Sequence, residues 1–100
     1  MSSFRELINS DKPVLVDFYA EWCGPCKTMS PVLEELKEEL GDKARIIKVD
    51  VDRNTKAAVY YGVRGVPTFM LFKNGDVLWR EAGVIPKHEL LDVINRHLLK

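Results

Sequence analysis

The hydrophobic and polar positions along the chain predict four strands. Val14–Tyr19 is apolar at nearly every position, as expected of a strand that is covered on both faces. Ile46–Val51 and Thr68–Phe72 are expected to form the second and third strands. The Asn-Gly pair at 74–75 is a strong signal for a hairpin turn, so Val77–Glu81 is expected to pair antiparallel with the strand before it.

Apolar residues at helical spacing predict four helices. In chain order, their apolar stripes are Phe4, Leu7 and Ile8; Met29, Val32, Leu33, Leu36 and Leu40; Ala57, Ala58, Val59 and Tyr61; and Leu90, Leu91, Ile94 and Leu98. Ser3 is expected to cap the start of the first helix, and Gly41 the end of the second. Pro31 lies inside the second helix and should kink it, while Asp52 or Asn54 is expected to cap the third.

The resulting order is helix, strand, helix, strand, helix, strand, strand, helix. A long helical connection joins the first two strands, which requires a parallel, right-handed crossover. Because the last two strands form an antiparallel hairpin, the sheet is expected to be mixed. We therefore predict an α/β fold, with a mixed four-stranded sheet flanked by four helices, in a single domain that spans residues 1–100.

The charge distribution argues against two classes of partner. Fifteen basic and fifteen acidic residues cancel and form no long run of one sign. Nucleic acids and anionic membranes both require a basic surface, so neither is an expected partner. No apolar segment approaches the ~20 residues that cross a bilayer. Residues 1–6 lack the basic and then apolar pattern of a secretory signal, so the expected location is the cytoplasm.

Both cysteines of the chain, Cys23 and Cys26, lie at the junction between the first strand and the second helix. A bridge between them would close a tiny loop and add little stability. Two thiols separated by two residues, one of them a proline, are instead typical of thiol–disulfide exchange. Cys23 is expected at the exposed start of the helix, where a thiolate is favoured, and is therefore the expected nucleophile. Cys26, about one turn deeper, is expected to resolve the mixed disulfide.

A zinc half-site and a pair of inert core thiols are the alternatives for the two cysteines. Zinc would need further ligands. The two histidines, His88 and His97, lie far along the chain on a different predicted helix. No metal site is therefore expected.

Asp17 is the one carboxylate within the first strand. It is either turned to solvent, as most aspartates are, or buried with a raised pKa. Its neighbours Leu15, Val16, Phe18 and Tyr19 are apolar on both faces of the strand, which favours burial. We therefore expect a buried carboxyl group with a raised pKa at this position.

Several motifs follow one another in a characteristic order. Trp-Cys-Gly-Pro-Cys-Lys at 22–27 comes after the strand that contains Asp17, and Val-Pro-Thr at 66–68 opens a later strand. Phe-Lys-Asn-Gly at 72–75 and then Gly83 complete the series. Together these motifs resemble the thioredoxin family from about Val14 to the C-terminus, and the resemblance implies the thioredoxin fold.

The resemblance is weaker at the start of the chain. Longer members of the family have an extra N-terminal strand, and only three residues precede the first predicted helix here. We therefore expect that strand to be missing and residues 46–51 to form an edge of the sheet. Lys48 and Asp50 would then discourage pairing with the edge of another molecule.

The resemblance also implies roles for individual residues. Asp17 would accept the Cys26 proton through water, as the second thiol becomes a nucleophile. Lys48 would modulate the Asp17 pKa, the alternative being a solvated lysine on the edge strand. Pro67, for which the sequence alone suggests an ordinary trans bond, is expected to be cis. The backbone of Val66 would pair with an extended segment of the substrate.

A shallow apolar groove for the substrate follows from the same resemblance. Its expected floor consists of Trp22, Gly65, Pro67, Gly83 and Val84, with Val66 beside it and with Gly24 and Pro25 shaping the loop between the cysteines. Trp22 is expected to be a partly exposed platform, the alternative being a core residue. The Gly-Pro insert lacks the histidine of more oxidising relatives and so resembles the reductases.

By resemblance, the chain is expected to be a general protein disulfide reductase. No bound cofactor is implied, because the electrons reside on the two sulfurs; thioredoxin reductase would replenish them from NADPH. Target proteins would bind briefly to a monomer. The alternatives are a thiol oxidase or isomerase on the same fold, a binding subunit whose thiols are incidental, and a zinc or iron–sulfur protein.

Overall fold

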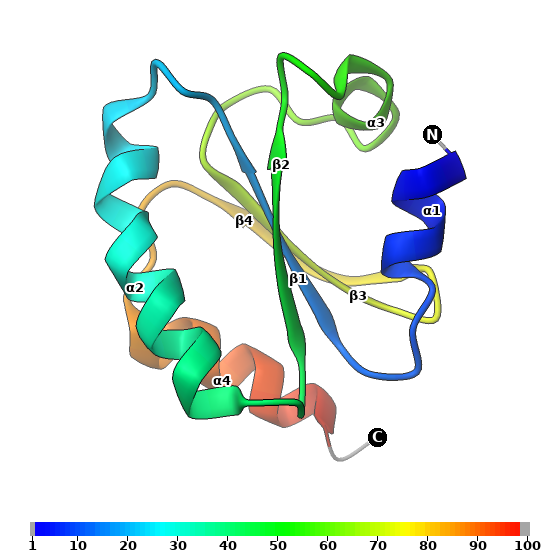
Figure 1. Cartoon of the computed structure of the whole chain (residues 1–100), viewed down its shortest axis with the longest axis vertical. Coiled ribbons are helices and arrows are strands. Elements are labelled where there is room, and N and C mark those ends of the chain that lie inside the picture. The colour runs from blue at the N-terminus through cyan, green and yellow to red at the C-terminus, as the bar shows by residue number, and fades with distance from the viewer. Residues whose placement is uncertain (1, 99–100) are drawn as a thin grey trace.

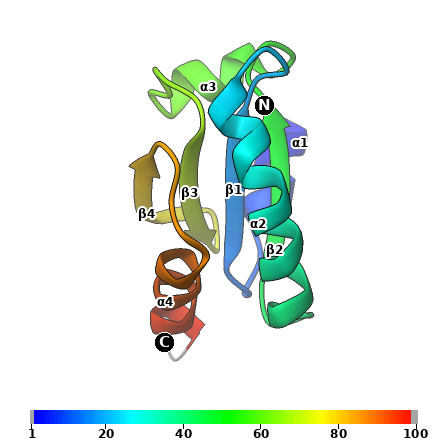
Figure 2. The ribbon, with the colours of Figure 1, turned by 90° about the vertical axis from the view of Figure 1, so that its left-hand side faces the viewer.

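A four-stranded sheet lies at the centre of the computed structural model, which describes residues 2–98. The elements are α1 (Ser2–Ile8), β1 (Val14–Tyr19), α2 (Gly24–Leu40), β2 (Arg45–Asp50), α3 (Thr55–Tyr60), β3 (Thr68–Lys73), β4 (Asp76–Ala82) and α4 (Lys87–Leu98). The strands lie side by side in the order β2-β1-β3-β4 (Figure 2). β1 and β2 are parallel, whereas β3 is antiparallel to both β1 and β4. The predicted order of elements and the predicted mixed sheet are confirmed.

The four helices cover both faces of this sheet. α2 and α4 lie on one face, and α1 and α3 lie on the other (Figure 1). The core under α2 and α4 includes Leu15, Met29, Leu33, Leu36, Phe69, Leu71, Leu90 and Ile94; the core under α1 and α3 includes Phe4, Ile8, Val14, Val16, Phe18, Met70 and Phe72. Successive residues of β1 therefore enter different cores, which explains why this strand is apolar nearly throughout.

The register of β1 places one carboxyl group among apolar side chains. Asp17 pairs with Lys48 of β2 and with Phe69 of β3. Directly paired residues project from the same face of a sheet. Since Phe69 belongs to the core under α2 and α4, Asp17 points toward the same side, where α2 begins beside the cysteines.

The hairpin between β3 and β4 has the predicted turn. Asn74 has a φ of 53° and Gly75 a φ of 82°, so both residues adopt the left-handed conformation that a type I′ turn requires. Asn and Gly reach this conformation at lower cost than other residues. The hairpin returns the chain along β3 as far as Ala82, which pairs with Thr68. It thereby places Gly83 next to the loop that precedes β3.

Two predictions about α1 were wrong. Ser3 lies inside the helix and does not cap it. Leu7 is exposed, whereas Phe4 and Ile8 are buried. Residues 4 and 8 lie one turn apart on one face of the helix, and both pack in the core that contains Phe18 and Phe72.

β2 forms one edge of the sheet, as predicted, and Lys48 is exposed on it. Asp50, in contrast, is buried. Its Oδ1 accepts a hydrogen bond from the Asp52 N–H at 2.9 Å, and its Oδ2 lies 3.8 Å from Arg53 Nε. Of the two charges expected to protect the edge, Lys48 is therefore the one in position to do so. Among residues 2–98, no helix is long and apolar enough to span a membrane.

Candidate active site

The two cysteines form a disulfide at the start of α2. Cys23 is the N-cap of this helix, and Cys26 lies in its first turn, with Cα atoms 5.3 Å apart. Pro25 occupies the first turn, where a missing N–H costs nothing. The N–H of Cys26 donates to Cys23 Sγ at 3.1 Å. Cys23 Sγ therefore occupies the position in which a capping side chain accepts from the helix, and negative charge is stabilised there.

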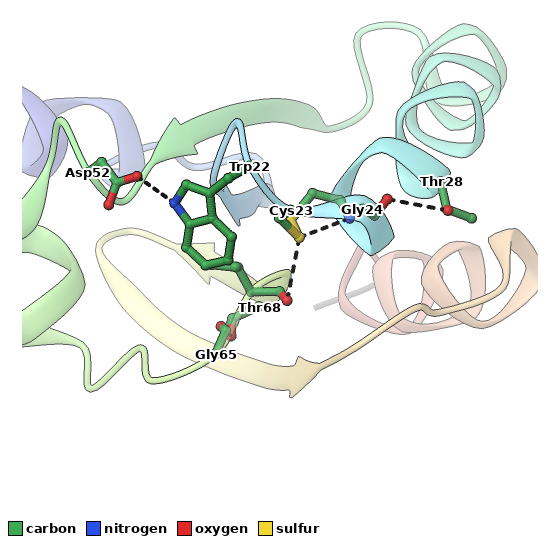
Figure 3. The surroundings of a disulfide bond; sticks show 9 residues. Trp22, Cys23, Gly24, Thr28, Asp52, Gly65 and Thr68 are labelled. Atoms are coloured by element: carbon green, nitrogen blue, oxygen red, sulfur yellow. Dashed lines mark hydrogen bonds between the residues drawn. A yellow bond between two sulfur atoms is a disulfide. The ribbon is translucent and has the colours of Figure 1, made fainter.

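The expectation that Cys23 lies at an exposed position was wrong. Cys23 is 3% exposed, as is Cys26, and both pack with Ala20 and against Val66. Cys23 Sγ lies 3.6 Å from the carbonyl oxygen of Val66 (Figure 3). The loop before β3 therefore covers the helix start that a strand–helix junction would otherwise leave open. A substrate disulfide must dock closely on the surrounding surface before it reaches the sulfur of Cys23.

The loop that covers Cys23 contains the predicted cis bond between Val66 and Pro67. Pro67 is buried, and its carbonyl oxygen accepts a hydrogen bond from the Gly83 N–H at 2.9 Å. Thr68 Oγ1 donates to the carbonyl oxygen of Gly65 at 2.5 Å. Hydrogen bonds at Gly65 and at Pro67, on either side of Val66, therefore hold the Val66 carbonyl group beside Cys23.

Trp22 is 71% exposed, as expected, so it is not a core residue. Its indole Nε1 donates to Asp52 Oδ2 at 2.9 Å (Figure 3). Asp52 was expected only as a possible helix cap. This contact could not be predicted from local sequence, since 30 residues separate the two side chains. The hydrogen bond fixes the orientation of a side chain that solvent would otherwise leave free.

Part of the predicted groove lines a hollow in the structure. Trp22 and Gly65 line one hollow of about 110 Å³, together with Val51, Val63, Arg64 and Val66. Gly83 and Val84 do not line it. Gly83 is joined to Pro67 through its N–H, and Val84 is 56% exposed beyond it. Gly24 and Pro25 are exposed at the start of α2. A substrate groove that includes all of the predicted residues stays a prediction.

Asp17 is fully buried, as predicted, with 0% exposure. Neither of its carboxylate oxygens has a hydrogen-bond partner among the described residues. Burial raises the Asp17 pKa from its ordinary value of 3.8 to about 6, because the charged form loses its hydration. The positive charge of Lys48 acts in the opposite direction and lowers this pKa. The roles that the resemblance implies for these two residues stay predictions.

Lys48, the register partner of Asp17 on β2, is exposed at the surface. Its Nζ lies 4.7 Å from the centroid of the Tyr19 ring, in a cation–π contact. Lys48 also lines a hollow of about 250 Å³ together with Tyr19, Ala20, Glu21, Cys26, Lys27 and Ser30. Lys48 of β2 and Cys26 of α2 therefore line the same hollow beside the active site.

Within residues 2–98, no group of three or more His, Cys, Asp or Glu side chains could hold a metal ion. His97 Nδ1 lies 2.7 Å from the carbonyl oxygen of Val93, one turn earlier on α4. The zinc alternative thus has no set of ligands in the described part of the chain.

A family model and known proteins with similar sequences indicate the family of this chain. The family model described as Thioredoxin matches residues 1–96 of the chain. Thioredoxin of Rickettsia prowazekii (strain Madrid E) is 48% identical over 98 residues, which cover 97% of this chain and 93% of that protein. Thioredoxin of Bacillus subtilis (strain 168) is 49% identical over 89 residues, which cover 89% and 86% of the two chains.

Solved structures agree with the sequence comparison. A mutant thioredoxin from Halobacterium salinarum NRC-1 matches this structure with a TM-score of 0.89 and 39% sequence identity. The match covers 98% of this chain and 85% of that one. The sheet of four strands with two helices on each face is therefore the thioredoxin fold. The chain belongs to the thioredoxin family.

Proposed function

We propose that Cys23 is the attacking thiolate and Cys26 the resolving thiol of this protein disulfide reductase. The reductase activity itself follows from membership of the thioredoxin family and from the disulfide at the start of α2. The assignment of roles is supported by one observation: the Cys26 N–H donates to Cys23 Sγ, which is also the N-cap position of the helix. Both features stabilise a thiolate on Cys23.

The reaction begins from the dithiol and proceeds in two exchange steps. The Cys23 thiolate attacks one sulfur of the substrate disulfide, so that an Sγ–S bond forms, the substrate S–S bond breaks and the leaving sulfur takes up a proton. The Cys26 thiolate then attacks Cys23 Sγ, which forms the Cys23–Cys26 disulfide and releases the second substrate thiolate. Two electrons pass to the substrate, and the protein ends in the disulfide form seen here.

Asp17 would act as the base for the second step. A carboxyl group with a pKa of about 6 is ionised near pH 7 and is still basic enough to accept a proton, through water, from the Cys26 thiol. Lys48, which pairs with Asp17 in the sheet, would adjust that pKa. The hollow lined by Lys48 and Cys26 supports a path for water and protons to this side of the site.

An extended segment of the target protein would bind across the loop before β3. The Val66 backbone, beside Cys23, would pair with it in the manner of an added strand. The exposed ring of Trp22, with Gly65 on the same hollow, would contact the flanking side chains. Gly24, Pro25, Pro67, Gly83 and Val84 would complete the surface around the sulfur atoms.

The reduction potential of the Cys23–Cys26 pair tests the direction of electron flow. We expect about −270 mV, the potential typical of thioredoxins, when the protein is equilibrated against a thiol buffer and the dithiol fraction is measured. A reductase needs this low value because its targets must be easier to reduce than its own disulfide. A potential near −120 mV, typical of a strong thiol oxidant, would favour the oxidase alternative.

The chain would act as a monomer, as a single domain of residues 1–100, in the cytoplasm. Its electrons would come from NADPH through thioredoxin reductase. The expected result is rapid oxidation of NADPH when catalytic amounts of the chain are mixed with a bacterial thioredoxin reductase and a disulfide-linked peptide. The absorbance of NADPH gives the rate directly. A double variant, Cys23→Ser with Cys26→Ser, is the matched control and should give no rate above background. An equal rate with this variant would contradict the proposed electron path.

A further inference from the structure

The side chain of Arg80, on β4, contacts the segment that follows α3. Its Nη1 donates to the carbonyl oxygen of Tyr61 at 2.6 Å, and its Nη2 donates to that of Gly62 at 3.2 Å. Arg80 pairs with Met70, which belongs to the core under α1 and α3, so its side chain leaves the sheet on the face that α3 covers. One guanidinium group therefore holds two successive backbone carbonyl groups.

The position of these two carbonyl groups explains why a guanidinium suits them. α3 ends at Tyr60, so the carbonyl groups that follow have no further helical N–H donors. They also lie at the negative end of the helix, where a positive charge is favourable. Gly62 has a φ of 66°, which turns the chain sharply there. The planar fork of arginine can bind both oxygens at once, whereas lysine offers a single point charge.

The segment that Arg80 holds leads directly to the active site. Residues 61–67 end in the Val66–Pro67 bond, and the Val66 carbonyl oxygen lies 3.6 Å from Cys23 Sγ. Arg80 fixes the start of this segment, and the Gly83 N–H fixes its end through the Pro67 carbonyl group. Both attachments come from the end of β4 and the residue that follows it. The position of Val66 relative to Cys23 therefore depends on β4.

We infer that Arg80 is a positioning residue for the docking of disulfide-containing segments. It acts through residues 61–67, because it sets where the Val66 backbone receives the substrate chain beside Cys23. The inference rests on the proposed function, in which an extended substrate pairs with Val66. Loss of the guanidinium should weaken substrate docking more than it changes the reactivity of the Cys23 thiolate. Arg80 donates to the Tyr61 and Gly62 carbonyl groups, whereas the N-cap position and the Cys26 N–H that stabilise the thiolate belong to α2.

Two reactions with different demands separate these effects. Reduction of a disulfide-linked peptide requires docking on the Val66 backbone. Alkylation of the reduced protein by iodoacetamide, a small reagent, requires the Cys23 thiolate and no such docking. We compare the wild type with Arg80→Gln and Arg80→Lys. Arg96→Gln is the matched control, because Arg96 is another exposed arginine whose Nε donates to a backbone carbonyl group, that of Asp92 on α4.

For Arg80→Gln we expect the KM for the peptide to rise about fivefold to tenfold, with kcat and the alkylation rate within about twofold of the wild type. Arg80→Lys should give an intermediate KM, since it restores the charge but not the fork. Arg96→Gln should match the wild type. Tyr61 packs against Phe4 and Phe72, so the segment should remain folded without Arg80. Should Arg80→Gln nevertheless fail to fold, Arg80→Lys carries the comparison.

An unchanged KM in Arg80→Gln, or an equal rise in Arg96→Gln, would overturn the inference. So would a parallel loss in the alkylation rate, because it would place the effect at the sulfur and not at docking. These outcomes leave the proposed function intact as long as the wild type reduces the peptide. A wild type that does not reduce the peptide would instead contradict the proposed function itself.

Discussion

Replacing Cys23 with serine is expected to lower the rate of disulfide reduction by about a thousandfold or more. A hydroxyl group is not ionised near pH 7 and cannot form a disulfide, so both the attack and the storage of electrons are lost. The measurement is the initial rate of reduction of a disulfide-linked peptide by the reduced variant. The loss should be the same at every substrate concentration, because the chemical step itself is removed.

Cys26→Ser provides the matched comparison, because it keeps the nucleophile and removes only the resolving thiol. This variant should attack the substrate once and then stop as a mixed disulfide between Cys23 and the peptide. Mass spectrometry without reductant would detect the adduct. If Cys23→Ser formed the adduct and Cys26→Ser did not, the two roles would be reversed. If the chain kept its cellular role with both cysteines replaced, the binding-subunit alternative would be correct.

Asp17→Asn is expected to stabilise the folded protein by about 3 kcal/mol at pH 7 to 8. The Asp17 pKa is about 6 in the folded state and 3.8, the ordinary value, in the unfolded state, so the folded state binds the proton more tightly. Stability from this group is fully present below pH 3.8 and is lost as the pH rises toward 6. The difference between wild type and variant in urea unfolding should therefore disappear below about pH 4 and be largest above pH 6.

Asp50→Asn is a suitable control for this stability effect. Asp50 is also buried, but its oxygens contact the Asp52 N–H and Arg53. Its replacement removes favourable interactions of a charged group, so it should destabilise the fold. Stabilisation by both substitutions would show that the effect is not specific to a buried carboxylate without partners.

The same Asp17→Asn variant should also turn over more slowly, by roughly a hundredfold at pH 7, because the base for Cys26 is lost. The deficit should shrink at higher pH, where Cys26 ionises without help. Lys48→Met tests the neighbouring charge: it removes the influence that lowers the Asp17 pKa, so the pH dependence should move to higher pH. Turnover of Asp17→Asn equal to wild type between pH 6 and 9 would contradict the role of Asp17.

The sequence by itself determined those features of this protein that depend on residues close together in the chain. The apolar run Val14–Tyr19 needs cover on both faces, and both cores provide it. Because this burial follows from strand periodicity alone, the burial of Asp17 could also be predicted. The Asn-Gly turn at 74–75 depends only on backbone conformation and was equally predictable. The cysteine pair at a strand–helix junction needs only its spacing to indicate the chemistry.

Tertiary structure decided what depends on residues far apart in the chain. Cys23 is buried because the Val66 loop lies over it, although its place at a helix start suggested exposure. Two contacts have no signal in the sequence. One is the hydrogen bond from Trp22 to Asp52, and the other is the pair of hydrogen bonds from Arg80 to the carbonyl groups that follow α3. Such contacts join surface side chains to loops whose relative position is set only when the sheet has paired. Local propensities determine the elements of this fold, whereas the register of the sheet determines how its active site is covered.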